Sequence, residues 1–347
     1  MYIFFAIYGL LCLWGIRLRL SREANPEYLS LAQTQAVKGI FILLVFFSHF
    51  SSYVTLTQWK DRLWLNLIGL VGQGMVTLFL FYSGYGVMES IRKKGKAYIA
   101  AMPKNRILAT LFRFDCAVIL FVILALFLGE TLSFSRVVLS FIGWDAVGNS
   151  NWYIFAVLAL YAITWIAFRL SGSDKPLLGT GLVFLGTFFY ILILSFRGLK
   201  PMHWYDTALC YPLGMAWSLL SGSKWESLLK KWIPWILALL VSVAGWYIFH
   251  NLAYTPINQI CTNLFFTLAF VLATMRISLG NPVLNWCGKH LFPLYILQRL
   301  PMIALKYLGL HDVSVVLYFL CCLGITAALV YPFEWCTDKL WNRIRGK

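Results

Sequence analysis

A lysine and a histidine inside one apolar stretch are the residues of this sequence best suited to chemistry. Lys38 and His49 are separated by ten residues, nine of which are Gly or apolar. In an α-helix these eleven steps rise about 16 Å and complete three turns plus about 20°, so both side chains lie on one face. With Lys38 at one membrane surface, His49 is expected near the middle of a hydrocarbon core about 30 Å thick. A neutral imidazole there suits a general base for a hydroxyl; the alternative is a neutral histidine hydrogen-bonded within a helix bundle.

A basic cluster is the second feature that can do chemistry. Six basic residues occupy the fifteen positions from Arg92 to Arg106, and Arg113 follows inside the next apolar run. Arg and Lys are common phosphate-binding residues, so the cluster suits a ligand that carries phosphates. We therefore expect Lys38, Lys104, Arg106 and Arg113 to bind such a ligand. An ordinary basic loop beside a membrane is the alternative.

Polar residues at the start of one apolar run and inside another are weaker candidates. Asn151 and Trp152 open an apolar run, where the amide suits a hydroxylated, sugar-like group and the indole suits a membrane interface. Gln298 and Arg299 lie inside a later run. An arginine in that position is expected to face the bundle interior or a water-filled cavity.

Carboxylates that could orient His49 are expected on the side of the membrane toward which it points. Asp206 and Asp145 are the two candidates. For the other histidines we favour solvated positions in outer loops or near a helix end: His203, His250, His311 and His290.

Small residues near the next apolar run predict close helix packing. Gly72 and Gly74 precede it, and Ser83 and Gly84 lie near its other end. Small side chains allow two helix backbones to approach each other in a membrane, so the primary expectation here is packing. Ser83 is also kept as a weak site candidate.

Composition identifies the kind of element that must position these residues. The chain has 347 residues, of which 61% are hydrophobic and 12% charged, and its mean hydropathy is +0.76. Soluble domains are about half apolar and a quarter charged, so the sequence predicts an all-α, polytopic membrane protein. The eight cysteines show no metal-ligand or CxxC spacing. They are therefore expected to be small buried residues, with neither a metal site nor a disulfide framework.

Eleven apolar runs are candidate membrane spans. They lie near residues 2–16, 37–57, 64–87, 107–129, 152–168, 178–196, 207–220, 232–249, 258–275, 291–309 and 313–333. The first run has no basic segment before it and no small-residue cleavage site after it, so we expect a retained helix and not a signal peptide. The gap from about 130 to 151 contains a segment, 131–144, that suits an interfacial or re-entrant piece.

The distribution of Lys and Arg predicts the orientation. Alternate gaps hold 21 basic residues in one set and 7 in the other. Cytoplasmic loops carry the excess of Lys and Arg, so we expect the N-terminus outside and the C-terminus in the cytoplasm. Most of the net charge of +16 is then explained by topology, and no nucleic-acid partner is expected.

Six segments, in order along residues 30 to 332, resemble signatures of the membrane acyltransferase-3 family. The Lys38-x10-His49 spacing is similar to the family's Arg-x10-His signature, with Lys in place of Arg. The other segments are Leu78-Phe-Leu-Phe-Tyr-Ser-Gly-Tyr85, Lys104-Asn-Arg106, Trp152-Tyr153, Tyr211-Pro-Leu-Gly-Met215 and the stretch from Cys287 to Gln298, in which Gln298 stands where His is common.

The resemblance implies a function and an architecture. The function is transfer of an acyl group, usually acetyl, from cytoplasmic acetyl-CoA or another acyl-CoA to a hydroxyl of an extracytoplasmic or lipid-linked glycan, as in polysaccharide modification of the cell envelope. The architecture is ten family-like helices over 31–347, with an extra N-terminal helix and linker over 1–30, in the plasma or inner membrane. His49 is then the catalytic base and the four basic residues above bind acyl-CoA. The acceptor or support candidates are Ser83, Asn151, Trp152, Asp206, Gln298 and Arg299.

Two other classes of protein remain as alternatives at this point. A transporter or flippase of a glycan or lipid-linked precursor also uses ionisable residues within the membrane, but it usually shows internal repeats, and none is evident here. A non-catalytic membrane assembly subunit is the other, and it stays open because Lys38 and Gln298 depart from the family's residues at two signature positions. Turnover of acyl-CoA separates the enzyme from both.

Overall fold

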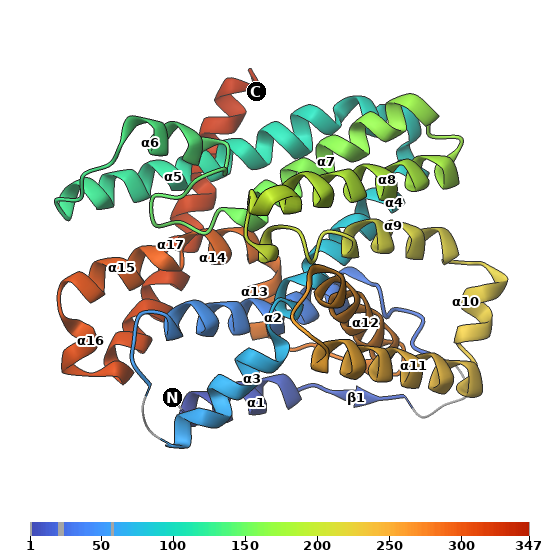
Figure 1. Cartoon of the computed structure of the whole chain (residues 1–347), viewed down its shortest axis with the longest axis horizontal. Coiled ribbons are helices and arrows are strands. Elements are labelled where there is room, and N and C mark those ends of the chain that lie inside the picture. Colours follow the sequence, from blue (N-terminus) through green and yellow to red (C-terminus); the bar gives the residue numbers. More distant parts are fainter. Residues whose placement is uncertain (1, 20–23, 57–58, 347) are drawn as a thin grey trace.

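The computed structural model describes residues 2–19, 24–56 and 59–346 (Figure 1). Two basic residues counted above, Arg22 and Lys347, lie outside this part of the chain. The long helices are α2 (Leu31–Ser51), α4 (Gly74–Met102), α5 (Ala109–Phe127), α7 (Trp152–Ser171), α8 (Pro176–Ser195), α11 (Trp232–Asn251), α12 (Pro256–Thr274) and α17 (Val315–Ile344). In Figure 1, α5, α7 and α8 lie side by side.

Shorter elements connect the long helices. The helices are α1 (Tyr2–Leu13), α3 (Arg62–Val71), α6 (Phe134–Phe141), α9 (Cys210–Leu220), α10 (Lys224–Leu229), α13 (Pro282–Lys289), α14 (Leu291–Leu297), α15 (Arg299–Tyr307) and α16 (Leu310–Val313). Single turns are η1 (Trp59–Asp61), the π-helical η2 (Pro103–Leu108), η3 (Phe196–Gly198) and η4 (Met202–Trp204). The exception to an all-α fold is an antiparallel pair of two-residue strands, β1 (Arg17–Leu18) and β2 (Ile277–Ser278).

The structure confirms a membrane protein of the all-α class. Among the described residues, seven helical regions are long and apolar enough to cross a bilayer: Leu31–Ser51, Arg62–Phe127, Trp152–Ser171, Pro176–Gly198, Trp232–Asn251, Pro256–Thr274 and Val315–Ile344. Each of the eleven predicted runs contains helix, but runs 2–16, 207–220 and 291–309 form short or interrupted helices. Eleven crossings therefore stay a prediction. The interfacial segment expected near 131–144 contains the short helix α6.

Helix α2 begins six residues earlier than predicted. Its first turns contain Gln33 and Thr34, both buried. Gln33 is satisfied because its Nε2 donates to the Ile277 carbonyl at 3.1 Å and its Oε1 accepts from the Leu279 N–H at 2.9 Å. Hydropathy cannot detect such a tertiary partner. The earlier start places His49 eighteen residues after Leu31 and two before the helix end. Its position near the middle of the hydrocarbon core stays a prediction.

The predicted run 64–87 is two helices, not one. Gly72 has a positive φ of 49°, a conformation that glycine adopts without steric cost, and it separates α3 from α4. Helix α4 then continues beyond residue 87 to Met102, with a second break at Gly95. The basic stretch expected to be a loop is therefore largely helical.

Backbone contact at glycine holds α4 against α9. A Cβ added to Gly84 would overlap the carbonyl oxygen of Tyr211, and one added to Gly214 would overlap the carbonyl oxygen of Phe81. Each helix therefore presents a glycine to the backbone of the other. This confirms the packing role expected for Gly84.

Helices α2 and α13 also pack through glycines that contact backbone carbonyl groups. A Cβ on Gly39 would overlap the carbonyl oxygen of Leu284, and one on Gly288 would overlap that of Gln35. Since Gly39 follows Lys38 in the sequence, the contact also determines which face of α2 is left for Lys38. Four backbone segments thus pack without intervening side chains.

We predict that Gly84→Ala destabilises the protein by about 1–3 kcal/mol, because the new methyl group must displace backbone and not a flexible side chain. Thermal unfolding of the purified protein in detergent measures this. Gly324→Ala, in α17, is the matched control because its Cβ would meet no atom within 4 Å. Equal melting temperatures for the two variants would contradict the role of the close contact.

Candidate functional site

A cavity of about 540 Å³ contains two of the predicted basic residues. We call it the lysine cavity. Lys38 reaches it from α2, Ser83 from α4 and Arg106 from η2, while Tyr161 and Tyr295 contribute from α7 and α14. Two cations in a cavity otherwise rich in aromatic and aliphatic side chains suit an anionic ligand with an apolar part.

Hydrogen bonds fix the polar side chains of the lysine cavity. The Arg106 Nε donates to the Tyr98 hydroxyl at 3.0 Å, and the hydroxyls of Ser83 and Tyr161 lie 2.9 Å apart. Arg106 belongs to η2, a π-helical turn, which is rare and occurs frequently at functional sites. Arg106 lines the cavity while Lys104, two positions earlier, does not, because residues two apart on a helix do not face the same side.

A second cavity, of about 240 Å³, contains His49. We call it the histidine cavity. Ser48 and His49 come from the end of α2, Gln73 from the start of α4, Trp152 from the start of α7 and His203 from η4. Helix ends from four parts of the chain thus meet around the imidazole.

One nitrogen of the His49 imidazole makes no hydrogen bond to the described part of the protein. Its Nδ1 is buried and has no hydrogen-bond partner among the described residues. The guanidinium of Arg299 acts on the ring electrostatically. An imidazole nitrogen without a protein partner is available to a ligand hydroxyl, as a general base requires.

Tyr295 lines both cavities. Its ring centroid lies 6.2 Å from that of His49 and 5.3 Å from that of Tyr153. A ligand in the lysine cavity and one in the histidine cavity would therefore approach each other at this side chain. The arrangement suits a reaction between two substrates that enter separately.

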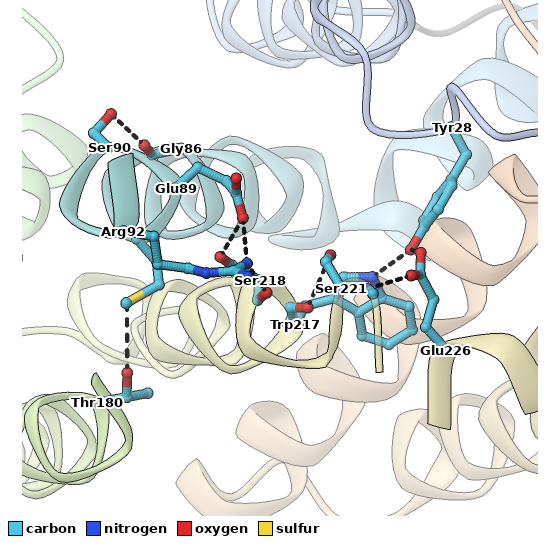
Figure 2. A network of polar contacts seen from close by, with 12 residues as sticks. Tyr28, Gly86, Glu89, Ser90, Arg92, Thr180, Trp217, Ser218, Ser221 and Glu226 are labelled. Atoms are coloured by element: carbon cyan, nitrogen blue, oxygen red, sulfur yellow. Dashed lines mark hydrogen bonds and ion pairs between the residues drawn. The ribbon is translucent and has the colours of Figure 1, made fainter. Parts of the chain in front are cut away.

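A polar network joins α4 to α9 (Figure 2). The Ser218 hydroxyl donates to Glu89 at 2.7 Å, and Arg92 bonds both Glu89 and the Ser218 carbonyl. The adjacent Trp217 Nε1 donates to the Tyr28 hydroxyl at 2.9 Å. The Tyr28 hydroxyl donates in turn to Glu226 of α10, at 3.1 Å. The network joins α4, α9 and α10 to the segment that leads into α2.

Comparison with protein families decides the assignment. The model of a family described as an acyltransferase domain matches residues 32–335, which is most of the chain. The chain belongs to the acyltransferase-3 family. Neither the curated proteins nor the solved structures contain a match to it. Membership implies an acyl donor, and with the long apolar helices it makes the protein a membrane acyltransferase.

The acyltransferase does not bring all four predicted basic residues to one cavity. Arg113 is partly exposed and its Nη2 lies 2.7 Å from Asp338. Lys104 lines a separate groove together with Asp115 and Arg345. Lys104 and Arg113 therefore do not line the lysine cavity with Lys38. Their predicted role in donor binding stays a prediction.

The two carboxylates that we expected to orient His49 do not contact its imidazole by a hydrogen bond. Neither Asp206 nor Asp145 makes a hydrogen bond to His49, whose Nδ1 is unpartnered among the described residues. Asp145 accepts from the Ala146 N–H instead, at 2.7 Å. Asp206 is buried beside α12, where its carbonyl oxygen accepts from Asn263 at 3.3 Å. The pairing with His49 was wrong because it relied on sides of the membrane, which do not determine lateral position.

The remaining candidates differ in position. Trp152 lines the histidine cavity, whereas Asn151 donates to the carbonyls of Gly143 and Asp145 at 2.9 and 3.0 Å and so holds the loop before α7. Gln298 is fully buried and donates to the Tyr295 carbonyl at 2.9 Å. Arg299 donates to the Tyr53 hydroxyl at 2.9 Å.

Two histidines are not solvated as expected. His203 lines the histidine cavity with its ring 5.4 Å from that of Trp152, and burial lowers its pKa. His290 is buried and pairs with Glu334 at 2.9 Å. Nothing in the spacing of the sequence connects His203 to His49.

We predict a pH-dependent stability that originates in Asp206. Burial raises the pKa of its carboxyl to about 7, above the unfolded value near 3.9. The protonated carboxyl therefore makes its full contribution to the free energy of unfolding below pH 4. This contribution is lost as the pH rises toward 7, by at most about 1.4 kcal/mol per pH unit. Melting temperatures of wild type and Asp206→Asn between pH 4 and 8 measure the effect. The variant should show a flatter profile; parallel profiles would contradict the assignment.

Proposed function

We propose that this acyltransferase is an integral membrane O-acyltransferase that moves an acyl group, typically acetyl, from cytoplasmic acyl-CoA to a hydroxyl of an extracytoplasmic or lipid-linked glycan. The observation that carries the proposal is the meeting of two chemically different cavities at Tyr295. One contains cations suited to the phosphates of CoA. The other contains a base suited to a hydroxyl.

In this proposal Lys38 and Arg106 bind the donor. Both line the lysine cavity, and Arg106 is held by Tyr98. Charge-assisted hydrogen bonds from Lys and Arg are well suited to phosphate oxygens. The thioester end of the donor then points toward Tyr295.

His49 activates the acceptor. The imidazole takes the proton of the hydroxyl as the hydroxyl oxygen bonds to the thioester carbonyl carbon. The carbon–sulfur bond then breaks, and the proton passes to the leaving CoA thiolate. Trp152 and His203 offer ring faces and edges for a sugar acceptor beside His49.

We also propose the orientation predicted from the basic residues, with the N-terminus outside. Tertiary contacts between loops support it, since they join segments of the same predicted side. On the cytoplasmic side β1 pairs with β2, Tyr28 bonds Glu226 and Arg345 bonds Asn105. On the outer side Lys200 donates to the Trp144 carbonyl and Arg299 to Tyr53.

The proposed domain division is an N-terminal helix and linker over 1–30 followed by the acyltransferase over 31–347. The family match beginning at residue 32 supports it. Helix α1 nevertheless packs on the domain, since the Tyr8 hydroxyl donates to the Ile40 carbonyl at 3.2 Å.

We predict that His49→Ala loses at least 100-fold in acyl transfer while it still binds acetyl-CoA, because a general base contributes about 10²–10⁴-fold to the rate. Lys38→Ala should instead weaken acetyl-CoA binding. Calorimetry and acceptor-dependent release of CoA measure the two effects in detergent. Lys93→Ala is the matched control, since Lys93 is an exposed lysine of the same basic stretch. Full turnover in a folded His49→Ala protein would end the proposal.

We predict that Tyr295→Ala relaxes the choice of acyl chain. Removal of the ring joins the two cavities, so that a longer chain fits beside His49, and one methylene is worth about 10-fold or more in discrimination. The ratio of hexanoyl to acetyl transfer should rise at least tenfold. Tyr295→Phe keeps the ring and should keep the preference for acetyl. An unchanged ratio in Tyr295→Ala would exclude this side chain as the partition.

A further inference from the structure

A groove beside the C-terminus has a chemistry that the acyl-transfer site does not use. We call it the C-terminal groove. Its volume is about 530 Å³, and it lies between η2, the first turns of α5 and the end of α17. Leu108, Leu111 and Ile344 line it, and the rings of Phe112 and Trp341 lie 5.2 Å apart within it. Most of its lining is therefore apolar.

Two cations line the same groove. Lys104 contributes from η2 and Arg345 from the residue after α17. The Arg345 Nη2 donates to the Asn105 side chain at 3.0 Å, which fixes the guanidinium. Its Nε is buried and has no hydrogen-bond partner among the described residues. A buried donor on a cation without a partner is costly, so an anionic acceptor is expected there.

The acidic groups around the groove are fewer than the basic ones. Asp115, in the second turn of α5, lines the groove. Asp338 is paired with Arg113 at 2.7 Å. Lys339 and Arg343 add exposed positive charge on α17. The field at this end of the groove is therefore positive.

The length of α17 puts this end of the groove at the membrane surface. Its thirty residues are about 45 Å long, whereas the hydrocarbon core is about 30 Å thick. An untilted helix of this length exceeds the core by about ten residues. The charged residues Asp338, Lys339 and Arg343 lie in its C-terminal part, so we place that part, with Trp341 and Ile344, at the membrane surface. An apolar groove with cations at headgroup level matches a phospholipid whose chain fills the groove and whose phosphate meets the cations.

We propose that the C-terminal groove binds an anionic phospholipid, with Lys104 and Arg345 at its phosphate. In the orientation proposed above this is a lipid of the cytoplasmic leaflet. The consequence concerns η2, which carries Lys104 at the groove and Arg106 at the lysine cavity. A bound lipid stabilises the turn that supplies the donor-binding arginine. The lipid is not itself a substrate in this inference.

The test is binding of dioleoylphosphatidylglycerol and dioleoylphosphatidylcholine to the purified protein in detergent, measured by native mass spectrometry. We expect the anionic lipid to bind at least tenfold more tightly. Lys104→Gln and Arg345→Gln should each weaken its binding about fivefold, as expected for loss of one cation near an anionic lipid. Arg343→Gln is the matched control, because Arg343 is exposed and does not line the groove.

Three outcomes would overturn the proposal. Equal affinity for the two lipids would remove the role of the cations, and an equal loss in Arg343→Gln would show a diffuse charge effect only. Displacement of the lipid by glycerol phosphate would identify a phosphate site that does not require the lipid chain. Circular dichroism of each variant checks its fold. Since neither cation lines the lysine cavity, failure here leaves acetyl-CoA binding by Lys38 and Arg106 to be judged separately.

Discussion

Backbone contact at glycine is the constraint on which the site depends. Two helix pairs, α4 with α9 and α2 with α13, approach until carbonyl oxygens occupy the space that a Cβ would need. In a bilayer the hydrophobic effect does not drive helices together, so packing of this kind and interhelical hydrogen bonds must hold them. With one face of α2 committed to α13 and one face of α4 to α9, the faces that carry Lys38 and Ser83 are left for the lysine cavity.

Keeping the two cavities apart has a physical reason. A continuous polar channel through the membrane would let water and ions pass, and water would compete with the acceptor for the thioester. Tyr295 can separate the cavities because its ring is large and apolar while its position lets it contact ligands from both sides. The proposed chemistry thus needs a barrier that small groups can cross, and a single aromatic side chain between His49 and Tyr153 meets that need.

Much of the fold could be predicted from the sequence, and the failures have identifiable causes. Apolar runs located the helices because burial in lipid requires them. The start of α2 was missed because Gln33 is satisfied by residues near 277, far away in the chain. Lys104 and Arg106 diverge because the basic stretch is helical here and residues two apart on a helix point to different sides, whereas the sequence analysis considered only their shared charge. His203 was missed because it reaches the histidine cavity from a loop, where no periodicity indicates direction.

The short strand pair has a consequence for the order in which the chain matures. β1 pairs with residues 277 and 278, and Asn281 donates to the carbonyls of Leu11 and Trp14 at the end of α1. These partners are synthesised about 260 residues after β1. At about 5–20 residues per second, this takes on the order of 10–50 s. Until then the carbonyl groups of Leu11 and Trp14 must accept hydrogen bonds from water, the insertion machinery or lipid headgroups. The end of α1 therefore reaches its final contacts only after most of the acyltransferase domain has been synthesised.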